Sequence, residues 1–219
     1  MIALTRLPEP AILTEKRAPW TEKLLAKRAD DPKARPASST YAHKNIVAAL
    51  AAMSHGKCFY CERSLKGQTP EVDHYHEVAD RPELAFAWEN LYLACGHCND
   101  KLSGQQLPPA ACLDPCAPGC APEEHLTFDD DQIRPRAGSA LGASTIRKYR
   151  LDDERRDYLR GRQLREFLKA QHAIDEARIR DGGRALTADE LELLRGFADR
   201  SQPYSLMFTV HLRRAGLLP

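Results

Sequence analysis

The sequence predicts an α+β fold in which a small zinc-bound core is embedded in a mainly helical chain. Two Cys-x2-Cys pairs, at 58–61 and 95–98, enclose a segment with one short strand-like stretch. Apolar residues recur at helical spacing before the first pair and again beyond about Gly142. Paired cysteines are typical of zinc knuckles, and the flanking periodicity is typical of amphipathic helices.

Composition and charge exclude several classes of protein. The 219 residues suffice for one substantial domain or two small ones. The mean hydropathy is −0.53, and the longest apolar run, Ile46 to Met53, is too short to span a bilayer. The opening MIALTRLPEPAIL lacks the pattern of a secretory signal, so we expect a cytoplasmic protein that contacts no membrane. Because the net charge is +1, a nucleic-acid partner needs a local basic patch.

Three regions are expected along the chain. Residues 1–40, rich in Pro, Arg and Ala, predict an extended arm with one short helix near 20–29. Residues 41–140 predict the zinc-bound domain, and residues 141–219 predict a helical region that binds substrate or a partner. Within these regions we expect a helix at 40–53 stopped by His55-Gly56, irregular structure at 107–122, a helix end at Gly182-Gly183, a capping box at 187–190 and a last helix at 204–212.

The two cysteine pairs predict a closed metal site. Two knuckles that meet supply four thiolates, which is a tetrahedral Zn²⁺ site with no open position for substrate. The zinc is therefore expected to be structural rather than catalytic. Two unrelated pairs, or a redox Cys-x-x-Cys, are the less favoured alternatives. His97, inside the second knuckle, is expected at the surface, and the four predicted ligands are Cys58, Cys61, Cys95 and Cys98.

Three further cysteines follow in a Pro- and Gly-rich stretch. Cys112, Cys116 and Cys120 are spaced Cys-x3-Cys-x3-Cys, and His125 lies just beyond them. Three thiols and an imidazole would suffice for a second zinc ion, but this spacing is unusual. Free thiols are therefore the favoured interpretation, with His125 holding its loop by hydrogen bonds.

Polar residues between and after the knuckles suggest a second, catalytic site. Asp73 and His74 are adjacent at the end of a strand-like stretch. Regular strand geometry would point them to opposite faces, but a distorted strand end can direct one to a metal and the other to a water. A helix opening after Cys95 would return Asn99 to the same metal.

This arrangement resembles the HNH endonuclease motif, which has the ββα-metal fold. In that motif an Asp-His pair begins the hairpin, an Asn lies in the hairpin loop, and a His or Asn from the helix completes the site. The corresponding residues here are Asp73-His74, Asn90 and Asn99. Interleaving with four zinc-binding cysteines is typical of a large HNH subgroup.

The resemblance implies a role for each of these residues. His74 would be the general base that takes a proton from the attacking water. Asp73 and Asn99 would bind one catalytic Mg²⁺ or Mn²⁺ through oxygen atoms. Asn90 would brace the loop and orient the base. His76, two residues beyond His74, is a candidate contact to phosphate or to a nearby water.

The flanking sequence is similar to the HNH subunit of Septu-type anti-phage systems. The likeness extends over about residues 40–160. The motifs that carry it are Tyr41-x-His43-x-x-Ile46, the GKCFYCE stretch from Gly56, Leu113-Asp-Pro115, Pro122-Glu-Glu-His-Leu126 and Ser144-Thr-Ile146. It breaks down in the cysteine-rich loop after Cys112. In that family the nuclease works with an ATPase subunit related to SMC and ABC proteins, so the resemblance implies such a partner here.

Two surfaces have open interpretations. Between Gln132 and Arg184, Lys and Arg exceed Asp and Glu by six, which indicates either a phosphate-binding patch or an ordinary solvated helix face. The apolar residues at 206–210 indicate either core packing, which is the default, or a docking surface for a partner. The basic cluster comprises Arg134, Arg136, Arg147, Lys148 and Arg150.

The leading functional prediction is a metal-dependent HNH endonuclease that cleaves DNA or RNA as the effector of a defence complex. One alternative is a stand-alone restriction-type HNH nuclease, but no separate sequence-reading module is evident. Another alternative is a non-catalytic zinc-dependent module that binds nucleic acid or serves as an adaptor. That alternative does not account for Asp73, His74, Asn90 and Asn99 all being present.

Overall fold

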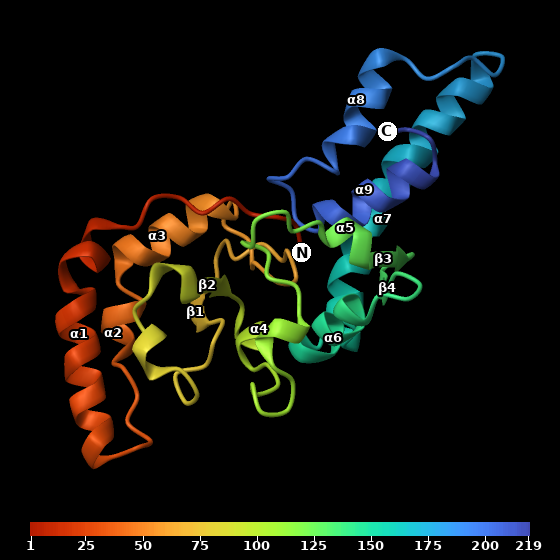
Figure 1. Ribbon diagram of the computed structural model, residues 1–219. Helices are drawn as coiled ribbons and strands as arrows, with labels where there is room; N and C mark the ends of the chain where they lie inside the picture. Colours follow the sequence, from red (N-terminus) through yellow and green to blue (C-terminus); the bar gives the residue numbers. More distant parts are fainter.

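The computed structural model describes residues 1–219 as a mixture of helices and two small antiparallel sheets. Figure 1 shows α1 to α3 and the β1–β2 sheet on one side and the C-terminal helices on the other. The strands are β1 (Glu71–His74), β2 (Leu91–Ala94), β3 (Leu126–Asp129) and β4 (Gln132–Pro135). The helices are α1 (Ala11–Asp30), α2 (Ser38–Tyr41), α3 (Lys44–Met53), α4 (Gly96–Asn99), α5 (Pro122–His125), α6 (Ala140–Tyr149), α7 (Glu154–Arg180), α8 (Ala188–Gly196) and α9 (Ser205–Arg214), and short 3-10 turns lie at Pro82–Leu84, Trp88–Asn90 and Pro109–Ala111.

The β1–β2 sheet and α4 form the predicted ββα unit. The two strands pair antiparallel, with Val72 opposite Leu93 and Asp73 opposite Tyr92. All four residues of β2 are buried, as expected for a strand covered on both faces. Cys95 immediately follows β2 and precedes α4. Because Glu71 pairs with Ala94, the unit places the start of β1 next to the second cysteine knuckle.

Helix α1 is longer than the sequence predicts. An extended arm with a short helix at 20–29 was expected, but residues 11–30 form one helix despite the internal Pro19. Leu13 and Leu24 on this helix are buried, and the Trp20 ring lies 5.5 Å from Phe86. The stabilisation from packing this apolar face exceeds the cost of the helical hydrogen bond that Pro19 removes.

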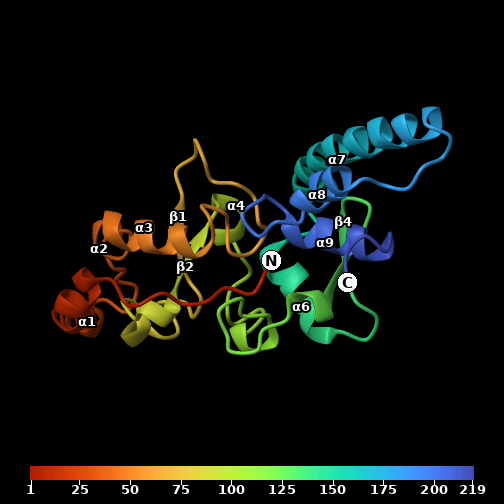
Figure 2. The same cartoon turned by 90° about the horizontal axis from the view of Figure 1, so that it is seen from above.

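The first residues tie the two sides of the molecule together. Figure 2 shows them running from the middle of the structure to α1. The α-amino group of Met1 contacts the buried Glu62 carboxylate at 2.8 Å. The Arg6 guanidinium donates to the Leu91 carbonyl at 2.7 Å and lies 4.4 Å from the centre of the Tyr92 ring. These contacts anchor the segment to the first cysteine knuckle and to the ββα unit.

A buried polar cluster joins the first cysteine knuckle to α9. Glu62 accepts hydrogen bonds from Lys57 at 3.3 Å and Ser205 at 2.6 Å. Lys57 also donates to the Arg200 and Gln202 carbonyls. Because each of these hydrogen bonds is buried or part-buried, the cluster fixes the C-terminal helices against the zinc-binding segment.

Most predicted features of the C-terminal region are confirmed. Thr187 and Glu190 form a reciprocal capping box at the start of α8, and Gly182 has a positive φ of 76° after α7. The β3–β4 hairpin, which precedes this region in the chain, was not predicted. Apolar residues of α9 are core residues rather than an open docking surface: Leu206, Met207, Phe208 and Val210 are buried.

The hydrophobic core is continuous. One cluster of 43 buried residues includes members from all three predicted regions, so the division at 40 and 140 remains a prediction. None of the helices combines the length and the apolar composition that crossing a bilayer requires.

Candidate active site and metal centre

The four predicted zinc ligands come together. The Sγ atoms of Cys58, Cys61, Cys95 and Cys98 all lie within 4.8 Å of one another, and all four residues are buried. The Cys61 and Cys95 sulfurs are 3.8 Å apart, far beyond a disulfide bond. A tetrahedral zinc ion with Zn–S distances of about 2.3 Å places its ligands about 3.8 Å apart. The cluster therefore fits Zn²⁺ and leaves no coordination position for substrate.

Helix α7 supplies a positive charge to this cluster. Arg156 donates from Nη1 to the Cys98 Sγ at 3.1 Å, and the arginine is only 6 % exposed. Four thiolates around Zn²⁺ would carry two net negative charges, and a guanidinium offsets one of them. The pKa of Arg156 is raised overall. Burial lowers it, but the effect of the neighbouring thiolates is larger, so the guanidinium stays charged. His97 lies at the surface, as expected.

A polar pocket of about 290 Å³ lies beside the end of β1. Residues from β1, the α4 turn and two other segments line it, so it joins positions that are distant in the sequence. Three of the predicted site residues meet there. The polar lining residues used below are Arg35, Tyr41, Asp73, His74, Glu77, Asn99 and Lys101.

His74 is held in one tautomer. Its Nε2 lies 2.9 Å from the Ala85 carbonyl, which can only accept, so Nε2 carries the proton and Nδ1 is left as an acceptor. The Tyr41 ring packs against the imidazole, with ring centres 4.7 Å apart. Burial lowers the pKa of His74 to about 4, although the bond to Ala85 opposes this. The imidazole is therefore neutral at pH 7 and able to take a proton.

Asp73 is buried and fully bonded. Its Oδ2 accepts from the Tyr60 hydroxyl at 2.6 Å. The Lys101 ammonium lies 2.8 Å from Oδ1 and 2.6 Å from Oδ2, and it also donates to the His74 carbonyl at 2.6 Å. Burial raises the pKa of Asp73, and Lys101 opposes that effect. Lys101 is thus the counter-cation of the carboxylate in this structure.

Asn99 reaches the same pocket from α4. Its Nδ2 donates to the Glu71 carboxylate at 2.6 Å, which orients the amide. No other residue donates a hydrogen bond to its Oδ1, so this oxygen remains available. A carboxylate and an amide oxygen are donors that Mg²⁺ or Mn²⁺ prefers, so the donor set of Asp73 and Asn99 fits such an ion.

Comparison with known proteins agrees with this geometry. Residues 58–105 match the family model of the HNH endonucleases. This chain carries an HNH domain. A segment of 103 residues is 32 % identical to the Septu protein PtuB of Bacillus thuringiensis. That match covers 46 % of this chain but only 37 % of the length of the relative.

Asn90 is a buried hydrogen-bonding residue next to the candidate active site. It is only 3 % exposed, and its Oδ1 accepts from the His76 backbone N–H at 2.6 Å. Its Nδ2 donates to the carbonyls of His76 and Leu84, both at 3.0 Å. These bonds hold the segment after β1 to the turn that contains Ala85. The His76 side chain does not line the pocket, and its ring lies 5.3 Å from Tyr75.

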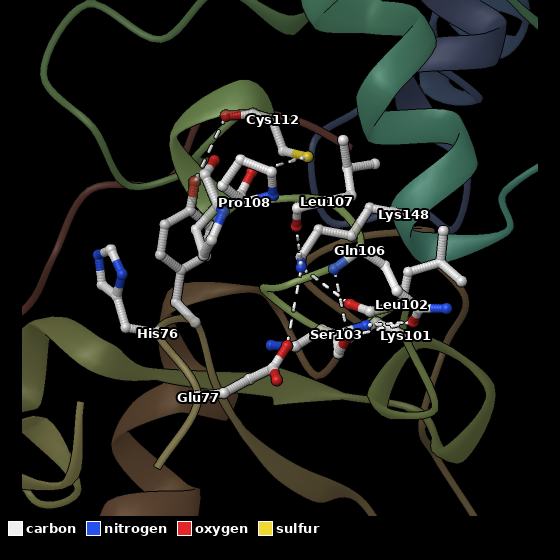
Figure 3. Close-up of polar contacts among 12 residues, drawn as sticks. His76, Glu77, Lys101, Leu102, Ser103, Gln106, Leu107, Pro108, Cys112 and Lys148 are labelled. Carbon is white, nitrogen blue, oxygen red and sulfur yellow. Dashed lines mark hydrogen bonds and ion pairs between the residues drawn. The ribbon is translucent and has the colours of Figure 1, made fainter. Parts of the chain in front are cut away.

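Lys148 is the clearest departure from the predicted basic surface. The sequence groups it with surface arginines, but its side chain is fully buried. Figure 3 shows it reaching from α6 towards the Leu102 and Leu107 carbonyls, at 2.9 and 2.8 Å, and the Glu77 carboxylate, at 3.8 Å. It therefore fixes the loop after Lys101. The four arginines of the predicted cluster are exposed.

The remaining cysteines do not form a second cluster. Cys112, Cys116 and Cys120 are free thiols, and only the four knuckle cysteines group as metal ligands. His125 instead bonds through Nδ1 to the Ser139 hydroxyl at 2.9 Å, consistent with a loop-fixing role.

Sequence reasoning missed Tyr60, Lys101 and Glu71 as partners of the predicted site residues. Lys101 stands two positions after Asn99, so its proximity to the motif was a usable signal. Tyr60 lies inside the first knuckle, where nothing in the sequence indicates a bond to Asp73.

Proposed function

We propose that this protein is a metal-dependent endonuclease that hydrolyses phosphodiester bonds in DNA or RNA. The observation that carries the proposal is the pocket itself. Within an HNH domain, it brings together the neutral imidazole of His74, whose Nδ1 is free, and the oxygen donors of Asp73 and Asn99.

His74 is the proposed general base. Nδ1 takes the proton of the attacking water, and the Ala85 carbonyl stabilises the imidazolium that forms by accepting from Nε2. Tyr41 packs on the ring and limits its rotation. Asn90 is a proposed positioning residue, because its side chain connects the segment after β1 to the turn that contains Ala85.

Asp73 and Asn99 are the proposed ligands of one Mg²⁺ or Mn²⁺. When bound, such an ion offsets charge on the scissile phosphate and on the departing oxygen. Tyr60 holds the Asp73 carboxylate in place, and Glu71 holds the Asn99 amide. The Lys101 ammonium donates hydrogen bonds to both Asp73 oxygens, so we expect it to compete with a divalent cation for this carboxylate.

We further propose that the protein is the effector nuclease of an anti-phage complex with an SMC/ABC-like ATPase subunit. The similarity to the Septu protein PtuB supports this role. A stand-alone nuclease and a non-catalytic binding or adaptor module are the alternatives that the test below separates.

The test is cleavage of plasmid, single-stranded DNA and total RNA, with Mg²⁺ or Mn²⁺ added or omitted. Wild type is compared with His74→Ala and with His172→Ala, whose imidazole is exposed on α7. Cutting that needs the added cation and is lost in His74→Ala alone supports the nuclease. The assay is repeated with the ATPase subunit present. If no substrate is cut in either format, the catalytic proposal is wrong.

A further inference from the structure

A second cavity, of about 150 Å³, lies between α1 and the segment that leads into α2. Trp20 and Phe86 contribute an aromatic surface to it. The charged residues that line it are Lys23, Lys27 and Arg35, and all three are basic. The acidic residues of this segment, Glu15, Glu22, Asp30 and Asp31, do not line it.

The three cations have no partner within the protein. All three are exposed, and none forms an ion pair or a side-chain hydrogen bond with another residue. Neighbouring arginines behave differently: Arg17 pairs with Glu9 at 3.1 Å, and Arg28 donates to the Ala34 carbonyl at 3.1 Å. Three uncompensated charges around one cavity produce a local positive potential that favours an anionic ligand.

This cavity adjoins the active site. Arg35 lines both it and the pocket that contains Asp73 and His74. Lys23 and Lys27 are one helical turn apart, so their side chains emerge next to each other on α1. A chain of phosphates leaving the active site past Arg35 would therefore meet the two lysines in succession.

Trp20 adds a second kind of contact. It is half-buried, and it stands one turn before Lys23 on α1. A basic surface next to an accessible aromatic ring is the combination that binds single-stranded nucleic acid, through phosphate contacts and base stacking.

We propose that this cavity, the α1 groove, binds the single strand of nucleic acid adjoining the scissile phosphate. Arg35, Lys23 and Lys27 contact its phosphates, and Trp20 offers a face to a base. The inference rests on the proposed function, because it assigns the path of the substrate on one side of the active site.

The probe is a fluorescein-labelled oligodeoxythymidylate, and binding to His74→Ala protein is followed by anisotropy without added divalent cation. Salt is varied between about 50 and 200 mM. We expect Lys23→Ala/Lys27→Ala to bind more weakly and to reduce the slope of log K against log salt by about 1.4, since each single-strand phosphate contact contributes about 0.7. Lys16→Ala/Lys33→Ala removes the same charge from exposed positions outside the groove and should change the slope little.

Tryptophan emission is the second measurement. Trp88, the other tryptophan, is only 3 % exposed, so stacking in the groove should quench Trp20 alone. We expect the oligonucleotide to quench the His74→Ala protein, and we expect Trp20→Phe in that background to abolish the quenching.

Unaltered binding by Lys23→Ala/Lys27→Ala, or an equal loss in the Lys16→Ala/Lys33→Ala control, would overturn the proposal. Absence of binding to the His74→Ala protein would overturn it as well. The proposed function fails differently. If the groove binds the probe as expected but no substrate is cut in the cleavage assay, the nuclease assignment is wrong and the binding site stands.

Discussion

Replacing Lys101 with methionine tests the electrostatics of the candidate active site. The substitution keeps the length of the side chain and removes the ammonium that lies 2.8 and 2.6 Å from the Asp73 oxygens. The side chains of both residues are almost fully buried, at 4 and 5 % exposure. Lys101→Met therefore leaves a buried carboxylate whose only remaining side-chain donor is Tyr60.

The expected effect on stability is large. Removing one partner of a buried ion pair costs about 3–5 kcal/mol. In a chain of this size each kcal/mol changes Tm by about 2–4 °C, so Lys101→Met should lower Tm by roughly 6–20 °C without divalent cations. A cation that binds Asp73 would replace the missing charge and stabilise the folded state. Mn²⁺ should therefore raise the Tm of Lys101→Met more than that of wild type.

Differential scanning fluorimetry measures both effects on zinc-loaded protein freed of other metals. Lys169→Met is the matched control, because its ion pair with Glu166 is exposed, with side-chain exposures of 72 and 60 %, and contributes less than about 1 kcal/mol. Asp73→Asn/Lys101→Met should lose the extra response to Mn²⁺. If Mn²⁺ raises the Tm of wild type and of Lys101→Met equally, the argument that Lys101 occupies a cation position is refuted.

Two further predictions concern residues that support the site. Arg156→Met should weaken zinc binding about 10–100-fold, because the thiolates lose their charged donor. Zinc release to a chromogenic chelator measures this effect, and release as slow as in wild type would contradict the assigned role. Asn90→Ala leaves the buried backbone of His76 without its partners and should lower the free energy of unfolding in urea by at least about 2 kcal/mol. The exposed Asn45→Ala is its control, and an unchanged midpoint for Asn90→Ala would show that the brace is dispensable.

Local sequence signals predicted the parts of the fold that depend on local chemistry. The cysteine pairs predicted the thiolate cluster because each knuckle is a short turn with a specific spacing. Thr187 and Glu190 predicted the start of α8 because a capping box is made within four residues. The Asp73-His74 pair was placed at a strand end, and the structure confirms that β1 ends at His74.

Features that depend on distant contacts could not be read from the sequence. The length of α1 depends on Leu13 and Leu24 finding a core, which outweighs the local effect of Pro19. Lys148 resembles a surface cation in the sequence, but it is buried because two loop carbonyls more than 40 positions away accept hydrogen bonds from its ammonium group. Lys101 bonds to Asp73 across 28 positions for the same kind of reason.

The comparison of wild type with His74→Ala in a single-turnover cleavage assay tests the central claim most directly. The assay contains Mg²⁺ or Mn²⁺ and, in a parallel series, the ATPase subunit. We predict cation-dependent cutting by wild type and a loss of about 10²–10⁴-fold in rate when the general base is removed. Cutting by His74→Ala at the wild-type rate would contradict the assignment of His74 and the mechanism built on it.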